Sequence, residues 1–213
     1  MYHLIKCEEL IPYHEGLQMQ AEAYERVRNG ESDGILFVLE HRPVYTIGAR
    51  GGWNNLLCSE QTLLERGIDV VQVDRGGNIT FHGPGQVVAY PVFDLSKLRK
   101  SARWYVSSLE QAVIDVLKQY GLEGSRKPEY QGVWIEDRKI SAVGVRLKRW
   151  ISTHGLSLNV TVDKSYFDLM NPCGITEFGI TSMEDHRDPI DIDQVKEQLV
   201  QSFEDVFQIR FEA

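Results

Sequence analysis

The segment Arg75-Gly76-Gly77-Asn78-Ile79-Thr80-Phe81-His82-Gly83-Pro84-Gly85-Gln86 combines four glycines with an arginine, a histidine and a proline. Glycine permits positive φ and lets the main chain approach a ligand closely. Pro84-Gly85 suits the central positions of a type II turn. The β-branched runs 69–73 and 87–90 predict a strand on each side. We therefore predict a rigid, glycine-lined loop between two strands, which is either a ligand platform or only a tight hairpin.

The rest of the chain adds helices and strands in an irregular order. Helical spacing and capping residues predict helices at 16–29, 59–67, 101–120 and 195–206, with strands at 35–39, 44–47, 132–135, 140–146, 152–160 and 208–211. Helices interspersed with strand pairs, without βαβ alternation, indicate an α+β domain with a mixed sheet. No repeat, low-complexity tract or linker is present, so residues 1–213 are expected to form one domain.

Composition narrows the functional class. The chain has 213 residues, 42% of them hydrophobic, and a net charge of −8, which is typical of a soluble globular protein and argues against nonspecific nucleic-acid binding. No apolar run approaches the ~20 residues that span a bilayer, and the first residues lack the apolar stretch of a signal peptide. Cys7, Cys58 and Cys173 are widely spaced, which disfavours a disulfide framework or a zinc site and suits a cytoplasmic location.

Charge is distributed unevenly. Residues 126–149 include seven basic and three acidic side chains, whereas residues 177–213 include ten acidic and three basic ones. The basic segment predicts either a docking surface for an acidic partner or an ordinary solvated strand surface.

Cys173 is the one cysteine with a distinctive setting, because Pro172 stiffens the chain before it and Gly174 removes crowding after it. A cysteine nucleophile reacts as the thiolate and needs a base or a cation nearby. Lys139, His82 and His154 are the candidates. Lys139 starts a predicted strand and could equally be a solvated edge charge, and His154 alternates with leucines like a buried core histidine.

Glycines interrupt two otherwise regular strands. Gly144 and Gly155 fall inside the predicted strands 140–146 and 152–160. A glycine within a strand often marks a bulge or the close approach of a ligand or another backbone. Two such strands beside apolar residues would form a slot for a hydrocarbon chain.

Taken together, these segments resemble the lipoyl(octanoyl) transferase family, which transfers octanoyl groups from acyl carrier protein to other proteins. The matching pieces, in order, are Arg75-Gly76-Gly77-x-x-Thr80-Phe81-His82-Gly83-Pro84-Gly85-Gln86, Gly132-Val133-Trp134, Arg138-Lys139-Ile140 with Gly144-Val145-Arg146, Thr153-His154-Gly155-Leu156-Ser157-Leu158-Asn159-Val160, and Pro172-Cys173-Gly174. They span roughly residues 36–183. Less standard is the segment 147–151, which resembles an insertion between two motifs.

The resemblance implies a fold like that of the biotin and lipoate protein ligases, a mixed sheet flanked by helices. It implies that Cys173 is the acyl-thioester nucleophile and that Lys139 lowers the pKa of this thiol and shuttles protons. The implied substrate-binding residues are Arg75, Gly76, Gly77, Asn78, Ile79, Thr80, Phe81, His82, Ala142, Val143, Gly144, Gly155, Leu156 and Ser157. No metal or other cofactor is implied.

The implied donor is octanoyl-acyl carrier protein. The implied acceptors are lysines in the lipoyl domains of 2-oxoacid dehydrogenase E2 subunits and in the glycine cleavage H protein. Two other functions compete with this interpretation. An ATP-dependent lipoate-protein ligase would need a nucleotide-binding loop, of which Gly48-Ala49-Arg50-Gly51-Gly52 is only a faint echo. A non-catalytic acyl-carrier-binding module would not need both Cys173 and Lys139.

Overall fold

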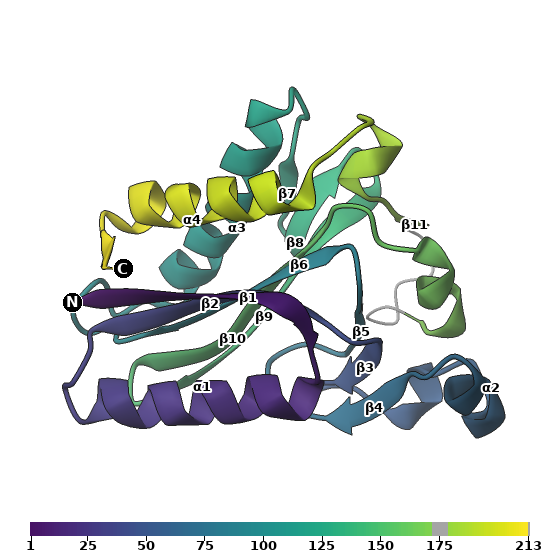
Figure 1. Ribbon diagram of the computed structural model, residues 1–213, viewed down its shortest axis with the longest axis horizontal. Helices are drawn as coiled ribbons and strands as arrows, with labels where there is room; N and C mark the ends of the chain where they lie inside the picture. The colour runs from purple at the N-terminus through teal and green to yellow at the C-terminus, as the bar shows by residue number, and fades with distance from the viewer. Residues whose placement is uncertain (172–178, 213) are drawn as a thin grey trace.

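The computed structural model describes residues 1–171 and 179–212, and their strands form two sheets (Figure 1). In the larger sheet the strand order is β12-β1-β2-β6-β10-β9-β8-β7, and β11 pairs with β9. The smaller sheet has the order β4-β3-β5. The larger sheet is mixed. The pairs β1–β2, β1–β12 and β9–β11 are parallel, whereas β2–β6, β6–β10, β10–β9 and β9–β8 are antiparallel.

The strands of the larger sheet are β1 (Tyr2–Ile11), β2 (Gly34–His41), β6 (Gln86–Phe93), β7 (Ser125–Lys127), β8 (Tyr130–Ile135), β9 (Arg138–Lys148), β10 (Ile151–Asn159), β11 (Gly179–Ile180) and β12 (Phe211–Glu212). The smaller sheet contains β3 (Val44–Ile47), β4 (Asp69–Gln72) and β5 (Ile79–His82). The helices are α1 (Tyr13–Arg28), α2 (Glu60–Glu65), α3 (Ala102–Gln119) and α4 (Ile192–Phe207), with short 3-10 turns at Trp53–Asn55, Lys164–Leu169 and Met183–Asp185.

The helices cover both faces of the larger sheet. Figure 1 shows α3 and α4 on one face and α1 on the other, with the smaller sheet and α2 at one end. Side chains that include Leu109, Val113 and Phe203 form the core under α3 and α4. Ala23 and Val27 of α1 pack on the opposite face. Helices packed on both faces of the sheet therefore hold the central strands in fixed positions, as a precise site requires.

Local signals explain where the helices begin and end. The Ser59 and Ser101 hydroxyls accept hydrogen bonds from the backbone N–H groups of Thr62 and Trp104, as N-caps do. The first helix begins at Tyr13, three residues before the predicted start. Pro12 precedes it because proline lacks an N–H group, which would have no partner within the helix at this position. The last helix ends where Gln208 adopts a left-handed conformation, so the final strand begins at Phe211 and the predicted strand 208–211 is shifted.

The glycine-rich segment departs most from its prediction. It is not one loop, since Ile79–His82 forms β5 and pairs with β3. The flanking strands β4 and β6 lie in different sheets, so the alternative of a simple hairpin is wrong. Ile79 and Phe81 alternate with polar residues as strand residues do, and the surrounding glycines conceal this pattern. The predicted turn is confirmed, since Gly85 has φ +80° and the Gln86 N–H donates to the Gly83 carbonyl.

Residues 147–151 complete a regular β-hairpin. Lys148 and Ile151 are paired across β9 and β10, so only Arg149 and Trp150 form the turn of a hairpin. Both have positive φ, as a two-residue hairpin turn requires.

Candidate active site

A cavity of about 580 Å³ is lined by β5, the 75–78 segment and the central strands β8, β9 and β10. This volume lies within the range of small-molecule sites. It brings together most of the predicted binding residues, namely Arg75, Gly76, Gly77, Asn78, Ile79, Thr80, His82, Ala142, Val143, Gly144, Gly155, Leu156 and Ser157, with Lys139. Phe81 is the exception, because its side chain points away from the cavity into the core of the smaller sheet.

The two interrupting glycines are required by close backbone approach. Gly144 and Gly155 face each other in the β9–β10 register. A Cβ atom on Gly155 would lie 2.1 Å from the Ala89 carbonyl oxygen, and one on Gly144 would lie 3.0 Å from the Gly76 carbonyl oxygen. Glycine at these positions therefore lets β6 and the 75–78 segment pack tightly against the cavity strands.

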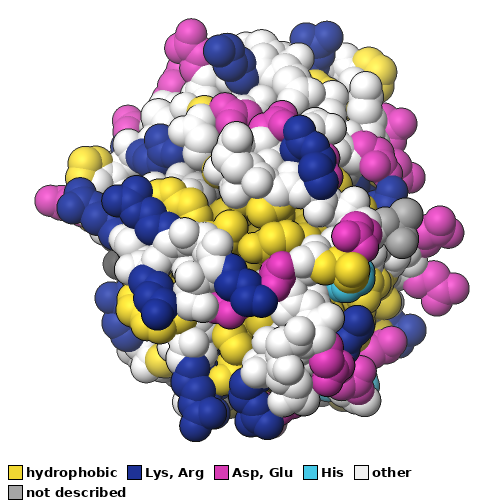
Figure 2. Space-filling view, turned by 90° about the vertical axis from the view of Figure 1, so that its left-hand side faces the viewer, with side chains coloured by type: hydrophobic (Ala, Val, Ile, Leu, Met, Phe, Trp, Pro, Cys, Tyr) yellow, Lys and Arg dark blue, Asp and Glu magenta, His cyan; other side chains and the backbone are white. Residues whose placement is uncertain are grey.

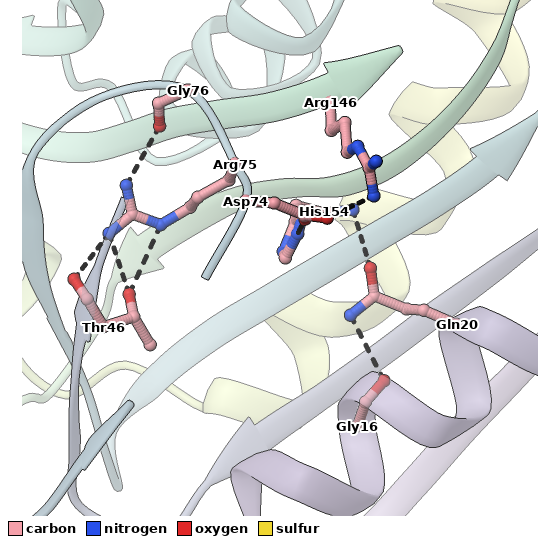
Figure 3. A network of polar contacts seen from close by, with 8 residues as sticks. All are labelled: Gly16, Gln20, Thr46, Asp74, Arg75, Gly76, Arg146 and His154. Carbon is pink, nitrogen blue, oxygen red and sulfur yellow. Dashed lines mark hydrogen bonds and ion pairs between the residues drawn. The ribbon is translucent and has the colours of Figure 1, made fainter. Parts of the chain in front are cut away.

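Arg75 places a buried cation in the cavity wall (Figure 3). Its guanidinium donates to the carbonyl and hydroxyl oxygens of Thr46 at 2.7 and 2.8 Å and to the Gly76 carbonyl at 3.0 Å. These contacts fasten the glycine-rich segment to β3 and make this wall electropositive.

The cavity wall also contains buried imidazole and phenol groups. His82 lines the cavity and stacks on Tyr13, and beside them the His41 Nε2 atom lies 2.7 Å from the Tyr90 hydroxyl. Burial lowers the pKa of His82 to about 3 and that of His41 to about 4. Both rings are therefore neutral at physiological pH and act as hydrogen-bonding groups.

A hydrogen-bonded chain of side chains leads from the cavity to Thr181, the residue that follows β11. His82 Nδ1 lies 2.7 Å from Gln86 Oε1, Gln86 Nε2 donates to Asn159 Oδ1 at 2.9 Å, and Asn159 Nδ2 donates to the Thr181 carbonyl at 3.0 Å. The roles of Tyr13, His41, Tyr90 and Asn159 were not predicted, because no local pattern reveals contacts between residues so far apart in the sequence.

Lys139 lies at the edge of the cavity beside β8. Its Nζ atom donates to the Gln131 carbonyl at 3.1 Å and lies 4.8 Å from the centre of the Trp134 ring. Residues Gly179 and Ile180 pair with Arg138 and Lys139, and the Thr181 N–H donates to the Lys139 carbonyl at 3.0 Å. Cys173 lies outside the described residues. The first described residues after Asn171, Gly179 and Ile180, therefore lie beside Lys139.

The surroundings of the other two cysteines, Cys7 and Cys58, disfavour their thiolates on balance. Burial raises the pKa of the Cys7 and Cys58 thiols, and nearby Glu15 raises that of Cys7 further. A raised pKa disfavours the thiolate that a nucleophile needs.

The basic segment 126–149 does not form one patch. Arg126 and Lys127 pair with Glu110 and Asp137. Arg138 and Lys148 are at opposite ends of β9, which places them about 33 Å apart. Figure 2 shows basic and acidic side chains interspersed around apolar surface on the face it presents. Of the basic residues of this segment, Lys139 lines the cavity, and Arg138 is its neighbour in the chain.

Two further properties hold for the described part of the chain. Residues 1–171 and 179–212 contain no group of three His, Cys, Asp or Glu side chains placed to hold a metal ion. None of the helices that these ranges form is long and apolar enough to cross a membrane.

Comparison with known proteins places the chain among enzymes of protein lipoylation. The family model of the lipoyl protein ligase A/B catalytic domain matches residues 12–204. An octanoyltransferase of Caldanaerobacter subterraneus subsp. tengcongensis is 49% identical over 95% of this chain and 89% of its own length.

Solved structures share the fold at low sequence identity. Lipoate-protein ligase A bound with ATP has a TM-score of 0.77 at 16% identity, covering 99% of this chain and 86% of its own. Biotin protein ligase from Aquifex aeolicus has a TM-score of 0.58 at 13% identity, covering 97% of this chain and 70% of its own. The predicted fold class is thus confirmed.

Proposed function

The chain belongs to the family of the lipoyl protein ligase A/B catalytic domain and is an acyltransferase of the octanoyltransferase type, and we propose that it transfers the octanoyl group through a thioester on Cys173. The supporting observation is the pairing of β11 with β9, which returns the chain from the 172–178 segment at Lys139. An amine beside the nucleophile's segment is what a cysteine needs to form a thiolate and exchange protons.

The reaction proceeds in two halves. In the first, Lys139 accepts the Cys173 thiol proton and the thiolate attacks the carbonyl carbon of the donor thioester. The bond from that carbon to the donor sulfur breaks, and the donor thiolate takes the proton back from Lys139. One thioester replaces another, so the exchange is nearly isoenergetic and needs no ATP.

In the second half, the amine of an acceptor lysine attacks the enzyme thioester. A carbon–nitrogen bond forms, the carbon–sulfur bond to Cys173 breaks, and the amine proton passes through Lys139 to the cysteine sulfur. The product is an amide, which is more stable than a thioester and drives the reaction forward. Asn78, Thr80 and the neighbouring lining residues hold the acyl chain in the cavity.

The donor in this proposal is octanoyl-acyl carrier protein, and the acceptors are lipoyl domains of 2-oxoacid dehydrogenase E2 subunits and the glycine cleavage H protein. The reaction takes place in the cytoplasm. The cavity volume suits a single medium-length acyl chain, and its walls include the apolar residues Ile79, Val143 and Leu156.

Intact-protein mass spectrometry tests the proposal. The enzyme is mixed with octanoyl-acyl carrier protein without ATP, and one octanoyl adduct is expected on the wild type and none on Cys173→Ala. Cys7→Ala and Cys58→Ala serve as matched controls and should still be acylated. Acylation of the Cys173→Ala variant, or transfer that requires ATP, would contradict the mechanism, and the ATP result would favour a ligase.

A further inference from the structure

The 74–77 segment crosses β9 beside Gly144, the last residue of that strand that lines the cavity. On β9, Ala142, Gly144 and Arg146 alternate with residues of the opposite face, so all three project to the same side. Ala142 and Gly144 line the cavity. Arg146, the next residue on that side, forms an ion pair with Asp74 (Figure 3).

Two further contacts hold the 74–77 segment down at this point. The Gly76 N–H donates to the Val145 carbonyl at 3.0 Å. The Asp74 Oδ1 atom lies 3.1 Å from Nε2 of the buried His154 on β10. No described residue forms a hydrogen bond with Nδ1 of this ring. His154 is therefore a neutral ring that donates its Nε2–H to Asp74.

His154 has an unusual backbone for a strand residue, with a φ of 57° in the middle of β10. Within the described residues, the other non-glycine residues of positive φ, Glu136, Arg149, Trp150 and Gln208, lie in hairpin turns or at a helix end. A left-handed residue inside a regular element persists only when its surroundings enforce it, and such residues gather at functional sites.

Gln20 of α1 enforces this conformation. Its Oε1 atom accepts the His154 N–H at 2.6 Å, and its Nε2 atom donates to the Gly16 carbonyl at 3.2 Å (Figure 3). The turned backbone aims the imidazole at Asp74 and away from the face that alternation would predict. Helix α1 thus fixes His154, and His154 in turn fixes the 74–77 segment.

The distance from Lys139 to this closed end matches a medium-length acyl chain. Five residues separate Lys139 from Gly144 along β9, which corresponds to about 17 Å. Three bonds of extended backbone advance about 3.5 Å, so the seven carbon–carbon bonds of an octanoyl group advance about 8 Å. The remaining ~9 Å is taken up by the carbon–sulfur bond, the contact of the sulfur with the lysine amine and the van der Waals contact of the terminal methyl group with the end wall.

We propose that Asp74 and His154 together set the acyl chain length, by fastening the 74–77 segment as the end wall of the cavity. This inference rests on the proposed octanoyl transfer and names positioning residues for it. Neither side chain touches the reacting atoms. Asp74 acts through the position of the Arg75–Gly76 backbone over Gly144, and His154, which itself lines the cavity, acts through its contact with Asp74 as well.

The test is a competition among donors that differ only in chain length. Equimolar octanoyl-, decanoyl- and dodecanoyl-acyl carrier protein are offered to each variant, and the acyl groups on a lipoyl domain are counted by mass spectrometry. Asp74→Ala and His154→Asn each release the end wall, and asparagine tolerates the left-handed conformation at position 154. Two more buried methylene groups at about 0.8 kcal/mol each should raise the decanoyl-to-octanoyl ratio about 15-fold.

Two controls separate this role from general destabilisation. Asp74→Asn keeps an oxygen acceptor for His154 and should keep the wild-type ratio. Gln208→Val places a β-branched residue at a left-handed position far from the cavity, so it should lower the melting temperature and leave the ratio unchanged.

The outcomes distinguish the two proposals. If the decanoyl-to-octanoyl ratio is unchanged in both Asp74→Ala and His154→Asn, the chain-length role is overturned and octanoyl transfer still stands. The same conclusion follows if Gln208→Val raises this ratio as much as they do. If the wild type transfers no acyl group from any donor, the proposed function itself fails and the chain-length role fails with it.

Discussion

Alanine at Gly155 and alanine at Gly144 should have very different effects, although the two glycines are paired neighbours on adjacent strands. At Gly155 the added Cβ would lie 2.1 Å from the Ala89 carbonyl oxygen and 2.7 Å from Pro91 Cδ. Both obstacles belong to β6, a central strand that cannot move without disturbing the sheet. At Gly144 the nearest atoms are the Gly76 carbonyl oxygen at 3.0 Å and Arg75 Cδ at 3.2 Å, so a shift of a few tenths of an ångström in the 74–77 segment relieves the contact without moving a strand of the sheet.

These contacts translate into different losses of stability. Overpacking a rigid core costs about 1–3 kcal/mol, and Gly155→Ala should lie at the upper end of that range. A chain of this size loses about 2–4 °C of melting temperature per kcal/mol, so a decrease of about 6–12 °C is expected. For Gly144→Ala the small steric cost is offset by the reduced entropy of the unfolded chain, worth about 0.4–1 kcal/mol, so its melting temperature should stay close to that of the wild type.

Thermal unfolding followed by circular dichroism measures the stability of both variants, and the rate of octanoyl transfer measures the effect of Gly144→Ala on the cavity. Gly144→Ala should remain folded yet transfer more slowly, because its methyl group displaces the Arg75–Gly76 wall of the cavity. The reasoning is refuted if Gly155→Ala melts with the wild type, or if Gly144→Ala is the less stable of the two.

Three further predictions concern catalysis, docking and pH. Lys139→Ala should slow transfer strongly and Lys139→Arg should not restore it, because arginine keeps the charge and cannot accept a proton near neutral pH; near-normal turnover of the arginine variant in a steady-state assay would show that charge alone suffices. Arg138→Glu should raise the KM for octanoyl-acyl carrier protein and Lys148→Glu should not, since Arg138 precedes the cavity-lining Lys139 and Lys148 is at the opposite end of β9. Added salt, which screens charges over ~8–10 Å, should raise the same KM, and equal effects of the two reversals would place docking elsewhere. Acid should destabilise the fold, because His82 and His41 have pKa values of about 3 and about 4 in the folded protein and are protonated near pH 6.5 in the unfolded chain. Their contribution to stability is therefore complete above pH 6.5 and is lost as the pH falls from 6.5 toward their folded pKa values. At pH 5 each of the two histidines should lower the free energy of unfolding by about 2 kcal/mol. The variant His82→Gln should therefore lose about half of the acid sensitivity in melting curves, and an unaltered pH dependence would contradict a neutral His82 in the folded protein.

The sequence predicted most elements of the fold because their signals are local. Ser59 and Ser101 cap helices, Gly121 follows the end of α3, and strand alternation in β10 is visible by eye. The strand β5 was missed because it has only four residues, with glycines on both sides, and because its pairing with β3 is a tertiary contact. Short strands of this kind are stabilised by their partners and not by their own composition.

The candidate site was predicted in part for the same reason. The motifs located the cavity walls, since Arg75, Lys139, Gly144 and Gly155 carry recognisable spacing. They gave no indication that Phe81 points into a core or that His154 leaves the alternation of its strand. The conformation of His154 depends on Gln20, a residue 134 positions away, and no pattern within one segment records such a contact.

The shared fold does not by itself decide between transfer and ATP-dependent ligation, since a lipoate ligase solved with ATP superimposes on this chain at 16% identity. Function on a common fold is determined by the groups placed at its site. Here the distinguishing groups are a cysteine framed by Pro172 and Gly174 and a lysine to which the chain returns through β11. A ligase activates a free acid and needs no protein thiol, whereas a transferase that starts from a thioester needs a thiol and a proton carrier. In the proposed mechanism Lys139 is that proton carrier, and its backbone pairing with β11 is consistent with this role.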